Sequence, residues 1–283
     1  MVITADLVKK LRDATGAGMM DCKKALTEAN GDFAEAEKIL KKMGLAAVAK
    51  RQDRATDNGR VFVKVAKNKA ILINLTCETD FVATNKEFIA LGEKICDVAL
   101  EKGYTEINDE LNGMVNDLIS IIKENMSLAN LTVYDIAADE LAAAYTHGEG
   151  SLAVLVKIKA GDSAVFEKEE VKEFANDLAL HVAAFTPSYL SREKVDEKYI
   201  AEQVEIFTAQ AAKLDKPPKV VEGIVKGKLN KHLGEICFLN QAFVKDDTVT
   251  VAQKAKEIAK AVGTTIEIVD YAYLKAGWAS CAI

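Results

Sequence analysis

The residues of this sequence that could perform covalent chemistry are few and widely separated. The three histidines are His147, His181 and His232, and no H-E-x-x-H or G-x-S-x-G pattern accompanies them. The nearest approach to a phosphate-binding loop is Gly16-Ala17-Gly18, which lacks a third glycine and a preceding strand. These spacings favour a protein that binds and rearranges a partner over one that makes or breaks bonds. We expect no cofactor and no metal.

The five cysteines indicate a reducing compartment rather than a disulfide framework. Cys22 precedes two lysines, which could lower the pKa of its thiol, but the sequence offers no evident base. A half-buried structural thiol is therefore favoured, and a thiol enzyme based on Cys22 stays open as an alternative. The cysteine number is odd, and no C-x-x-C pair occurs among Cys22, Cys77, Cys96, Cys237 and Cys281.

One aromatic residue has two competing interpretations. Phe81 lies in the segment C-E-T-D-F-V-A (77–83), between a predicted strand and a predicted helix, so we expect it on a loop. An aromatic side chain in such a place more often folds back into the core, and the residues alone favour that interpretation. The alternative is an exposed ring beside the Asp80 carboxylate, which is the profile of a binding anchor.

The elements that must position these residues begin with a predicted three-helix module. Thr4 can cap a helix that ends at Gly16, a second helix runs over 21–29, and Asp32 opens a third. Residues 45–57 are small and charged and indicate a tether rather than core, one that can still be helical.

The apolar period then changes to that of strands. Val61, Val63 and Val65 alternate with other residues, a turn follows at 67–69, and 70–77 is a second apolar run, which together predict a β-hairpin. Helical spacing resumes over 84–98 and 107–121. A short echo of residues 58–63 in 147–156 suggests a second α+β half. Its strands are expected near 152–159, 236–244 and 265–274, and its helices near 165–185 and 249–262.

An inserted segment has the pattern of an antiparallel helical hairpin. Apolar residues form a seam over 200–214 and again over 221–233, and Pro217-Pro218 prevents one continuous helix. The hairpin can fold on itself or offer a partner, including a second copy of the chain, a packing surface.

We therefore predict an α+β fold with four parts. They are a three-helix module and linker (1–54), a first core subdomain (55–140), a second core subdomain (141–188 and 236–283) and the inserted hairpin (189–235). The apolar fraction of 49% suits a globular protein, and the net charge of −6 gives no general attraction to nucleic acid or membranes. No run approaches the roughly 18 apolar residues of a membrane span, and the start lacks a signal-peptide pattern, so a cytoplasmic location is expected.

Two long motifs resemble the signatures of the elongation factor Ts family. The first is Leu11-Arg12 followed by T-G-A-G-M-M-D-C-K-K-A-L (15–26), and the second is T-D-F-V-A (79–83). Segments 145–148 (Y-T-H-G) and 181–184 (H-V-A-A) are also similar to that family, and the match is ordered along nearly the whole chain. The resemblance implies a ubiquitin-associated-like helical module, two related α+β subdomains with antiparallel sheets, and an inserted hairpin that is a candidate dimerisation domain.

The resemblance further implies nucleotide exchange on the GTPase elongation factor Tu, without covalent catalysis. The factor would stay bound until GTP displaces it, and a homodimer or a two-plus-two complex could form through the hairpin. The implied contacts are a wedge near the partner's magnesium site (Asp80 and Phe81, flanked by Thr79 and Val82), a phosphate-side contact (His147), the N-terminal module (Arg12, Met19, Met20 and Lys23) and Met126. Met126 closes K-E-N-M (123–126), where many relatives read G-E-N-I, and would replace an apolar contact.

A helical scaffold or nucleic-acid adaptor is the competing interpretation. It would use the slightly basic N-terminal module and the hairpin. The basic residues there alternate with acids, and no aromatic residues are interleaved for base stacking. A solvated helical face is the simpler explanation of those charges.

Overall fold

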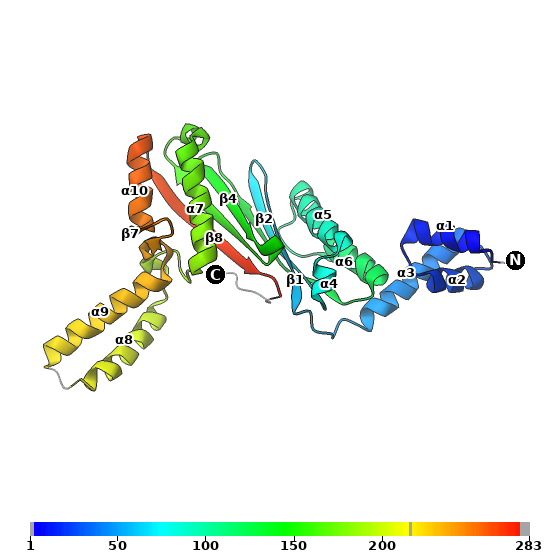
Figure 1. The fold of residues 1–283 in the computed structure, drawn as a ribbon, viewed down its shortest axis with the longest axis horizontal. Coiled ribbons are helices and arrows are strands. Elements are labelled where there is room, and N and C mark those ends of the chain that lie inside the picture. The colour runs from blue at the N-terminus through cyan, green and yellow to red at the C-terminus, as the bar shows by residue number, and fades with distance from the viewer. Residues whose placement is uncertain (1–2, 215–216, 278–283) are drawn as a thin grey trace.

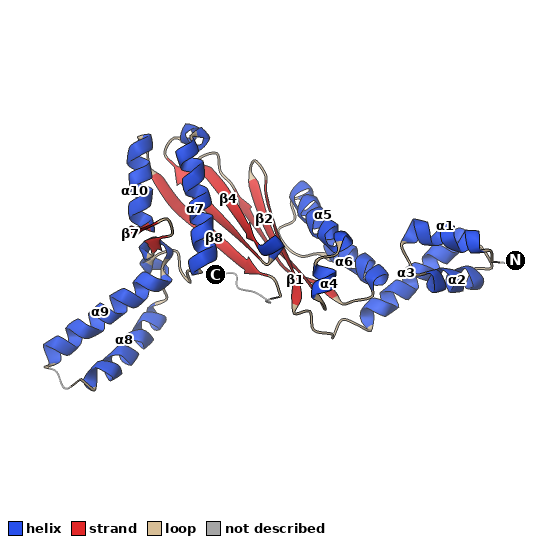
Figure 2. Ribbon diagram, viewed as in Figure 1, coloured by secondary structure: helices blue, strands red, loops and turns tan. Residues whose placement is uncertain are grey.

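Helical modules lie at the two ends of an elongated molecule with a β-rich body between them (Figures 1 and 2). This computed structural model describes residues 3–214 and 217–277. The predicted outer boundaries at residues 1 and 283, and Cys281, lie outside the described residues. No helix in the described part of the chain is long and apolar enough to cross a membrane.

The predicted three-helix module is confirmed. It consists of α1 (Ala5–Thr15), α2 (Met19–Glu28) and α3 (Phe33–Ala49) around a small apolar core. The Thr4 side chain accepts a hydrogen bond from the Leu7 amide, and Gly16 ends α1 in the left-handed conformation with φ +68°. One detail differs from expectation: α2 begins at Met19, because Gly18 is its N-cap, and not at residue 21. The expected tether begins as the last residues of α3.

The first sheet contains the predicted hairpin and one strand that the sequence did not reveal. Strands β1 (Asn58–Val65), β2 (Lys69–Cys77) and β3 (Met126–Asp135) are antiparallel in the order β1-β2-β3. Helices α4 (Asp80–Ala83), α5 (Lys86–Lys102) and α6 (Asp109–Ile122) connect β2 to β3. β3 lacks a clear period of two because polar residues interrupt its apolar pattern.

The second sheet repeats this order. Strands β4 (Glu140–His147), β5 (Leu152–Ala160) and β8 (Ile266–Lys275) pair as β4-β5-β8, with η1 (Gly148–Gly150) between the first two. Helices α7 (Glu169–Phe185), preceded by η2 (Ser163–Glu167), and α10 (Val251–Val262) pack against it. In both sheets a hairpin comes first and the last strand returns beside the second. The sequence echo aligned β1 with β5. The two sheets instead correspond strand by strand as β1 with β4 and β2 with β5, so the repeat was predicted with the wrong strands matched.

The two sheets pack face to face, with helices outside. Along β2, Ile71, Ile73 and Leu75 face the helices of the first half, whereas Ala70 and Leu72 face the second sheet. A strand buried on both sides carries apolar residues on both faces, which explains the apolar run over 70–73, while Asn74 and Thr76 are buried polar exceptions in the same strand. The β5 strand divides its side chains in the same way.

The predicted helical hairpin is confirmed as α8 (Glu197–Ala212) and α9 (Pro218–Ile236), preceded by η3 (Arg192–Lys194). The strand expected near 236–244 is wrong. There α9 ends, η4 (Phe238–Asn240) follows, and only the short β6 (Ala242–Phe243) pairs with β7 (Asp246–Thr250). Most apolar residues of this segment instead pack into the core of the second half, where the Phe238 ring stacks on His181 of α7 with centroids 5.3 Å apart.

His181 is fully buried and held in its neutral form. The Val244 amide donates to His181 Nδ1 at 3.2 Å, so the ring proton is on Nε2, which lies 2.9 Å from Gln241 Oε1. Burial lowers the pKa of His181 below its usual value, and the hydrogen bond to Gln241 opposes that shift only in part.

We therefore expect the stability to fall as the pH falls below about 6.5. In the unfolded chain His181 takes up a proton near that pH, whereas in the folded protein it stays neutral down to a lower pH. The free energy of unfolding should decrease in this window by at most about 1.4 kcal/mol per pH unit. Below the pKa of His181 in the folded protein, the contribution of His181 to this free energy should no longer change with pH. Urea unfolding at pH 7.5 and 5.5 measures the effect. His181→Gln should have a smaller pH dependence, and an unchanged one would contradict the assignment.

Candidate functional site

Phe81 is the most exposed large apolar side chain in the described part of the chain, at 82%. It lies on the four-residue helix α4 and not on a loop. The expectation that its ring folds into the core is therefore wrong, and the open alternative of an exposed anchor describes what is seen. A ring in water without apolar neighbours gains free energy when a partner buries it.

The turn that carries Phe81 is held firmly from below. The Thr79 hydroxyl accepts from the Val82 amide at 3.3 Å and caps the helix. The Glu124 carboxylate accepts from the Thr79 amide at 3.2 Å and from its hydroxyl at 3.0 Å. Val82 is buried at 6% exposure and fixes the other side of the turn. The backbone of α4 is thus fixed while the ring of Phe81 points outward.

Asp80 gives this anchor a charged neighbour. It is exposed, and its Oδ1 accepts from the Phe81 amide at 2.9 Å. The Thr84 hydroxyl donates to the Phe81 carbonyl at 3.0 Å and closes the turn. An apolar ring and a carboxylate therefore stand side by side on one rigid support, the kind of mixed anchor that hot spots use.

Arg60 connects this turn to the exposed His147. Its Nε donates to the Ala83 carbonyl at 2.8 Å, and its Nη2 lies 3.1 Å from Glu149 Oε2 in the turn that follows His147. His147 Nδ1 lies 3.0 Å from the Tyr145 hydroxyl. A hollow of about 230 Å³ lies between the two turns and is lined in part by Asp80 and Glu149. The structure thus brings Asp80, Phe81 and the His147 turn together.

The predicted contact residues of the N-terminal module are all exposed. Arg12 is on the last turn of α1, and the other three are on the first turns of α2. Met19 is 45% and Met20 74% exposed, and Lys23 follows at the helical spacing that places it on the same side. Figure 1 shows this module beyond α5 and α6, away from the β-rich body.

Two of the predicted contact residues are not on the surface. Met126 is 4% exposed, pairs with Cys77 in the β2–β3 register and packs in the core beneath α5 and α6. Val82 is buried in the same core. The prediction that Met126 and Val82 contact the partner directly is therefore corrected, because the protein's own core encloses both side chains. Val82 instead anchors α4, and Thr79 caps it.

The thiol-enzyme interpretation of Cys22 is contradicted by its surroundings. The thiol is fully buried, and its Sγ lies 3.6 Å from the Ala17 carbonyl that it donates to. Burial raises the pKa of Cys22, and it raises the pKa of Cys77 and of Cys96 to about 12. Such thiols are poor nucleophiles near neutral pH. Over residues 3–214 and 217–277 no group of three or more His, Cys, Asp or Glu is placed to hold a metal.

Comparisons with known proteins agree with the motifs. The family described as Elongation factor TS matches residues 78–277, more than half of the chain. Elongation factor Ts of Treponema denticola is 51% identical over 268 residues, which cover 95% of this chain and 96% of that protein. Elongation factor Ts of Borrelia recurrentis is 45% identical over 278 residues, covering 98% and 100%. The protein of the same name from Treponema pallidum is 45% identical over 274 residues, covering 93% and 94%.

Proposed function

The chain belongs to the elongation factor Ts family, and we propose that it promotes GDP release from elongation factor Tu by inserting Phe81 into that partner. It is accordingly an exchange factor and not an enzyme. The observation that carries the proposal is the 82% exposure of Phe81 on a turn whose backbone is fixed by Thr79 and Glu124. A fixed turn loses little conformational entropy on binding, so the free energy of burying the ring is available to distort the partner.

Linkage explains how such binding releases a nucleotide. A factor that weakens GDP binding by some ratio is itself weakened by GDP in the same ratio, so the ternary complex is a transient state. Mg²⁺ requires near-ideal octahedral geometry. If Asp80 and Phe81 displace the residues around the partner's Mg²⁺ slightly, the partner would hold GDP less tightly. Burial of the Phe81 ring contributes about 1.5–3 kcal/mol, or about a tenfold to hundredfold change in an equilibrium. GTP binding would then displace the factor.

We assign the remaining predicted contacts to two further surfaces. His147, joined to α4 through Arg60 and Glu149, would contact the partner near the nucleotide phosphates. The face of Arg12, Met19, Met20 and Lys23 would add affinity at a second place on the partner. The proposed division of the chain follows these roles: residues 1–54 contact the partner, 55–140 carry the wedge, and 141–188 with 236–283 carry His147. A partner in translation places the protein in the cytoplasm.

Release of a fluorescent GDP analogue from purified elongation factor Tu, followed by stopped flow, tests the proposal. The release rate should increase with the concentration of this protein and then saturate. If the rate is unchanged at every concentration, the exchange proposal fails for this partner, and the scaffold or nucleic-acid adaptor is the one to pursue.

We also propose that the hairpin of residues 189–235 joins two copies of the chain. Ile206, Leu214 and Val220 are between 46% and 49% exposed: Ile206 in the middle of α8, and the other two near the distal end of the hairpin. We expect sedimentation equilibrium to detect a dimer that Ile206→Asp weakens, since a charge in an apolar contact is costly. Glu205→Lys, a change at an exposed neighbouring position, is the control. If the wild-type protein is monomeric at all concentrations, or if the Ile206→Asp variant dimerises as strongly as wild type, the hairpin dimer is contradicted.

A further inference from the structure

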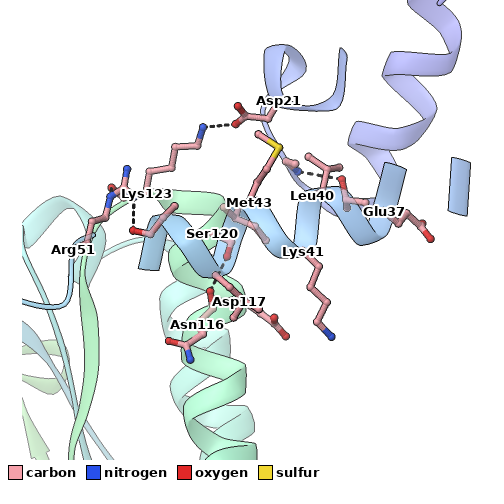
Figure 3. A pocket seen from close by; sticks show the side chains of 16 residues that line it. Asp21, Glu37, Leu40, Lys41, Met43, Arg51, Asn116, Asp117, Ser120 and Lys123 are labelled. Carbon is pink, nitrogen blue, oxygen red and sulfur yellow. Dashed lines mark hydrogen bonds and ion pairs between the residues drawn. The ribbon is translucent and has the colours of Figure 1, made fainter. Parts of the chain in front are cut away.

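Lys123 connects the core to the N-terminal module. It follows α6, and its ammonium group forms an ion pair with Asp21 on α2, across a crevice of about 440 Å³ between α2, α3 and α6 (Figure 3). The Lys123 carbonyl accepts from Arg51 Nε at 2.9 Å, which ties the end of the α3 segment to the same point. Lys123 therefore contacts the module with both its side chain and its backbone.

The backbone of Lys123 is unusual for a residue with a side chain. It has φ +68° and ψ +24°, the left-handed conformation at a helix C-cap that glycine adopts most easily. A glycine would relieve this backbone but could not reach Asp21. The lysine side chain therefore supplies an interaction that the position would otherwise lack.

The two ends of this ion pair lie next to the two proposed contact surfaces. Asp21 stands between Met20 and Lys23 on α2. The residue after Lys123 is Glu124, whose carboxylate holds the cap of the helix that carries Phe81. Lys123, which pairs with Asp21 beside the methionines, and Glu124, which holds the cap of the helix that carries Phe81, are therefore neighbours in the sequence.

Further contacts between module and core lie on both sides of this pair. Gly44 of α3 closely approaches the Ser120 hydroxyl of α6, Gly16 lies beside the Ile121 side chain, and Arg54 pairs with Glu78. Lys123–Asp21 adds to these contacts an ion pair that reaches α2, the helix that carries the methionine face. Figure 3 shows the Lys123–Asp21 pair at the side of the crevice away from Lys41.

We propose that Lys123 is a positioning residue that, through Asp21, holds the Met19–Met20 face at a fixed orientation to Phe81. This inference rests on the proposed exchange function. Two surfaces on one rigid body bind one partner with a higher effective concentration than two surfaces on a freely rotating pair. Loss of the pair should therefore weaken partner binding without changing the wedge itself.

The orientation can be measured on the protein alone. Spin labels on cysteines replacing Lys10 in α1 and Lys94 in α5, both exposed, report the distance between module and core by pulsed electron resonance. Cys281 is replaced by Ser so that it does not react, and the four cysteines in the described part of the chain are buried. The distance distribution should be narrow in the wild-type background.

The variants are Lys123→Met, which removes the charge and keeps the length, and Lys123→Gly, which also relieves the backbone. Lys159→Met is the matched control, because Lys159 pairs with Asp139 at 2.9 Å and its side chain is 49% exposed against 47% for Lys123. We expect both Lys123 variants to broaden the distance distribution and the control to leave it unchanged. An unchanged distribution in Lys123→Met overturns the proposal.

Exchange kinetics distinguish a positioning role from a purely structural one, because the half-saturating concentration of the factor would not change if Lys123 only stabilised the fold. In both Lys123 variants the half-saturating concentration of the factor should rise about two- to fivefold, the range of an exposed ion pair, with the rate at saturation unchanged. Lys123→Gly should do so although it melts no lower than wild type. If the wild-type protein itself does not accelerate release, the exchange function fails, and the distance measurement still decides whether Lys123 orients the module.

Discussion

Phe81→Ala should reduce the acceleration of GDP release by about tenfold to a hundredfold while leaving the melting temperature nearly unchanged. The ring is 82% exposed, so its removal creates no cavity in the folded protein. In the complex, the same removal forfeits the free energy of burying a phenylalanine side chain, about 1.5–3 kcal/mol. The measurement is the stopped-flow release rate at saturating factor, together with a thermal melt of each variant.

The matched control for this change is Phe185→Ala. Phe185 is also an exposed phenylalanine, at 49%, but it lies at the end of α7 and outside the proposed contact set. The control should exchange nucleotide as wild type does. Equal losses in the two variants, or a Phe81→Ala variant as active as wild type, would show that the ring at position 81 has no special role.

Glu124→Ala should have the second largest effect, although Glu124 is not a proposed contact residue. Its carboxylate accepts two kinds of hydrogen bond from Thr79, and hydrogen bonds to charged groups contribute about 1.5–3 kcal/mol each. A helix of four residues has no stability of its own, so α4 depends on this support. Without it the Phe81 ring would be presented in many orientations, and we expect exchange to fall about tenfold.

Two further variants separate support from contact. Glu124→Gln keeps one acceptor oxygen for Thr79 and should lie between wild type and Glu124→Ala. Glu110→Ala removes an exposed carboxylate at the start of α6 that pairs with Lys102 and Tyr104 beside the C-terminal end of α5, and should leave exchange unchanged. Full exchange activity in Glu124→Ala would contradict the claim that α4 must be held rigid.

The helices of this protein were predictable because their signals are local. Thr4 and Asp32 cap helices within three residues of themselves, and Pro217-Pro218 stand at the N-terminus of α9 and mark the break between the two hairpin helices. The segment near Phe238 was assigned wrongly for the opposite reason. Its apolar residues resemble a strand, but they are buried against α7, including His181, in the core of the second half, which no local pattern reveals.

The candidate site was predictable only in its motif. The sequence pointed to Asp80 and Phe81, but could not decide between a buried and an exposed ring. The groups that hold the turn come from distant positions: Glu124 lies 45 residues from Thr79, and Arg60 lies 89 residues from Glu149. Lys123 was noticed only as part of K-E-N-M, since its left-handed backbone and its contact with Asp21 depend on the packing of two separate parts.

The central claim is that binding of the Phe81 ring and binding of GDP oppose each other on one partner. The most direct test is the dissociation constant of this protein for elongation factor Tu, measured by titration calorimetry with nucleotide-free and with GDP-bound partner. Linkage predicts that wild type binds the nucleotide-free form at least about a hundredfold more tightly, and that Phe81→Ala reduces this ratio about tenfold or more. An equal ratio for wild type and Phe81→Ala would contradict the account, because Phe81 would then contribute to binding without opposing GDP.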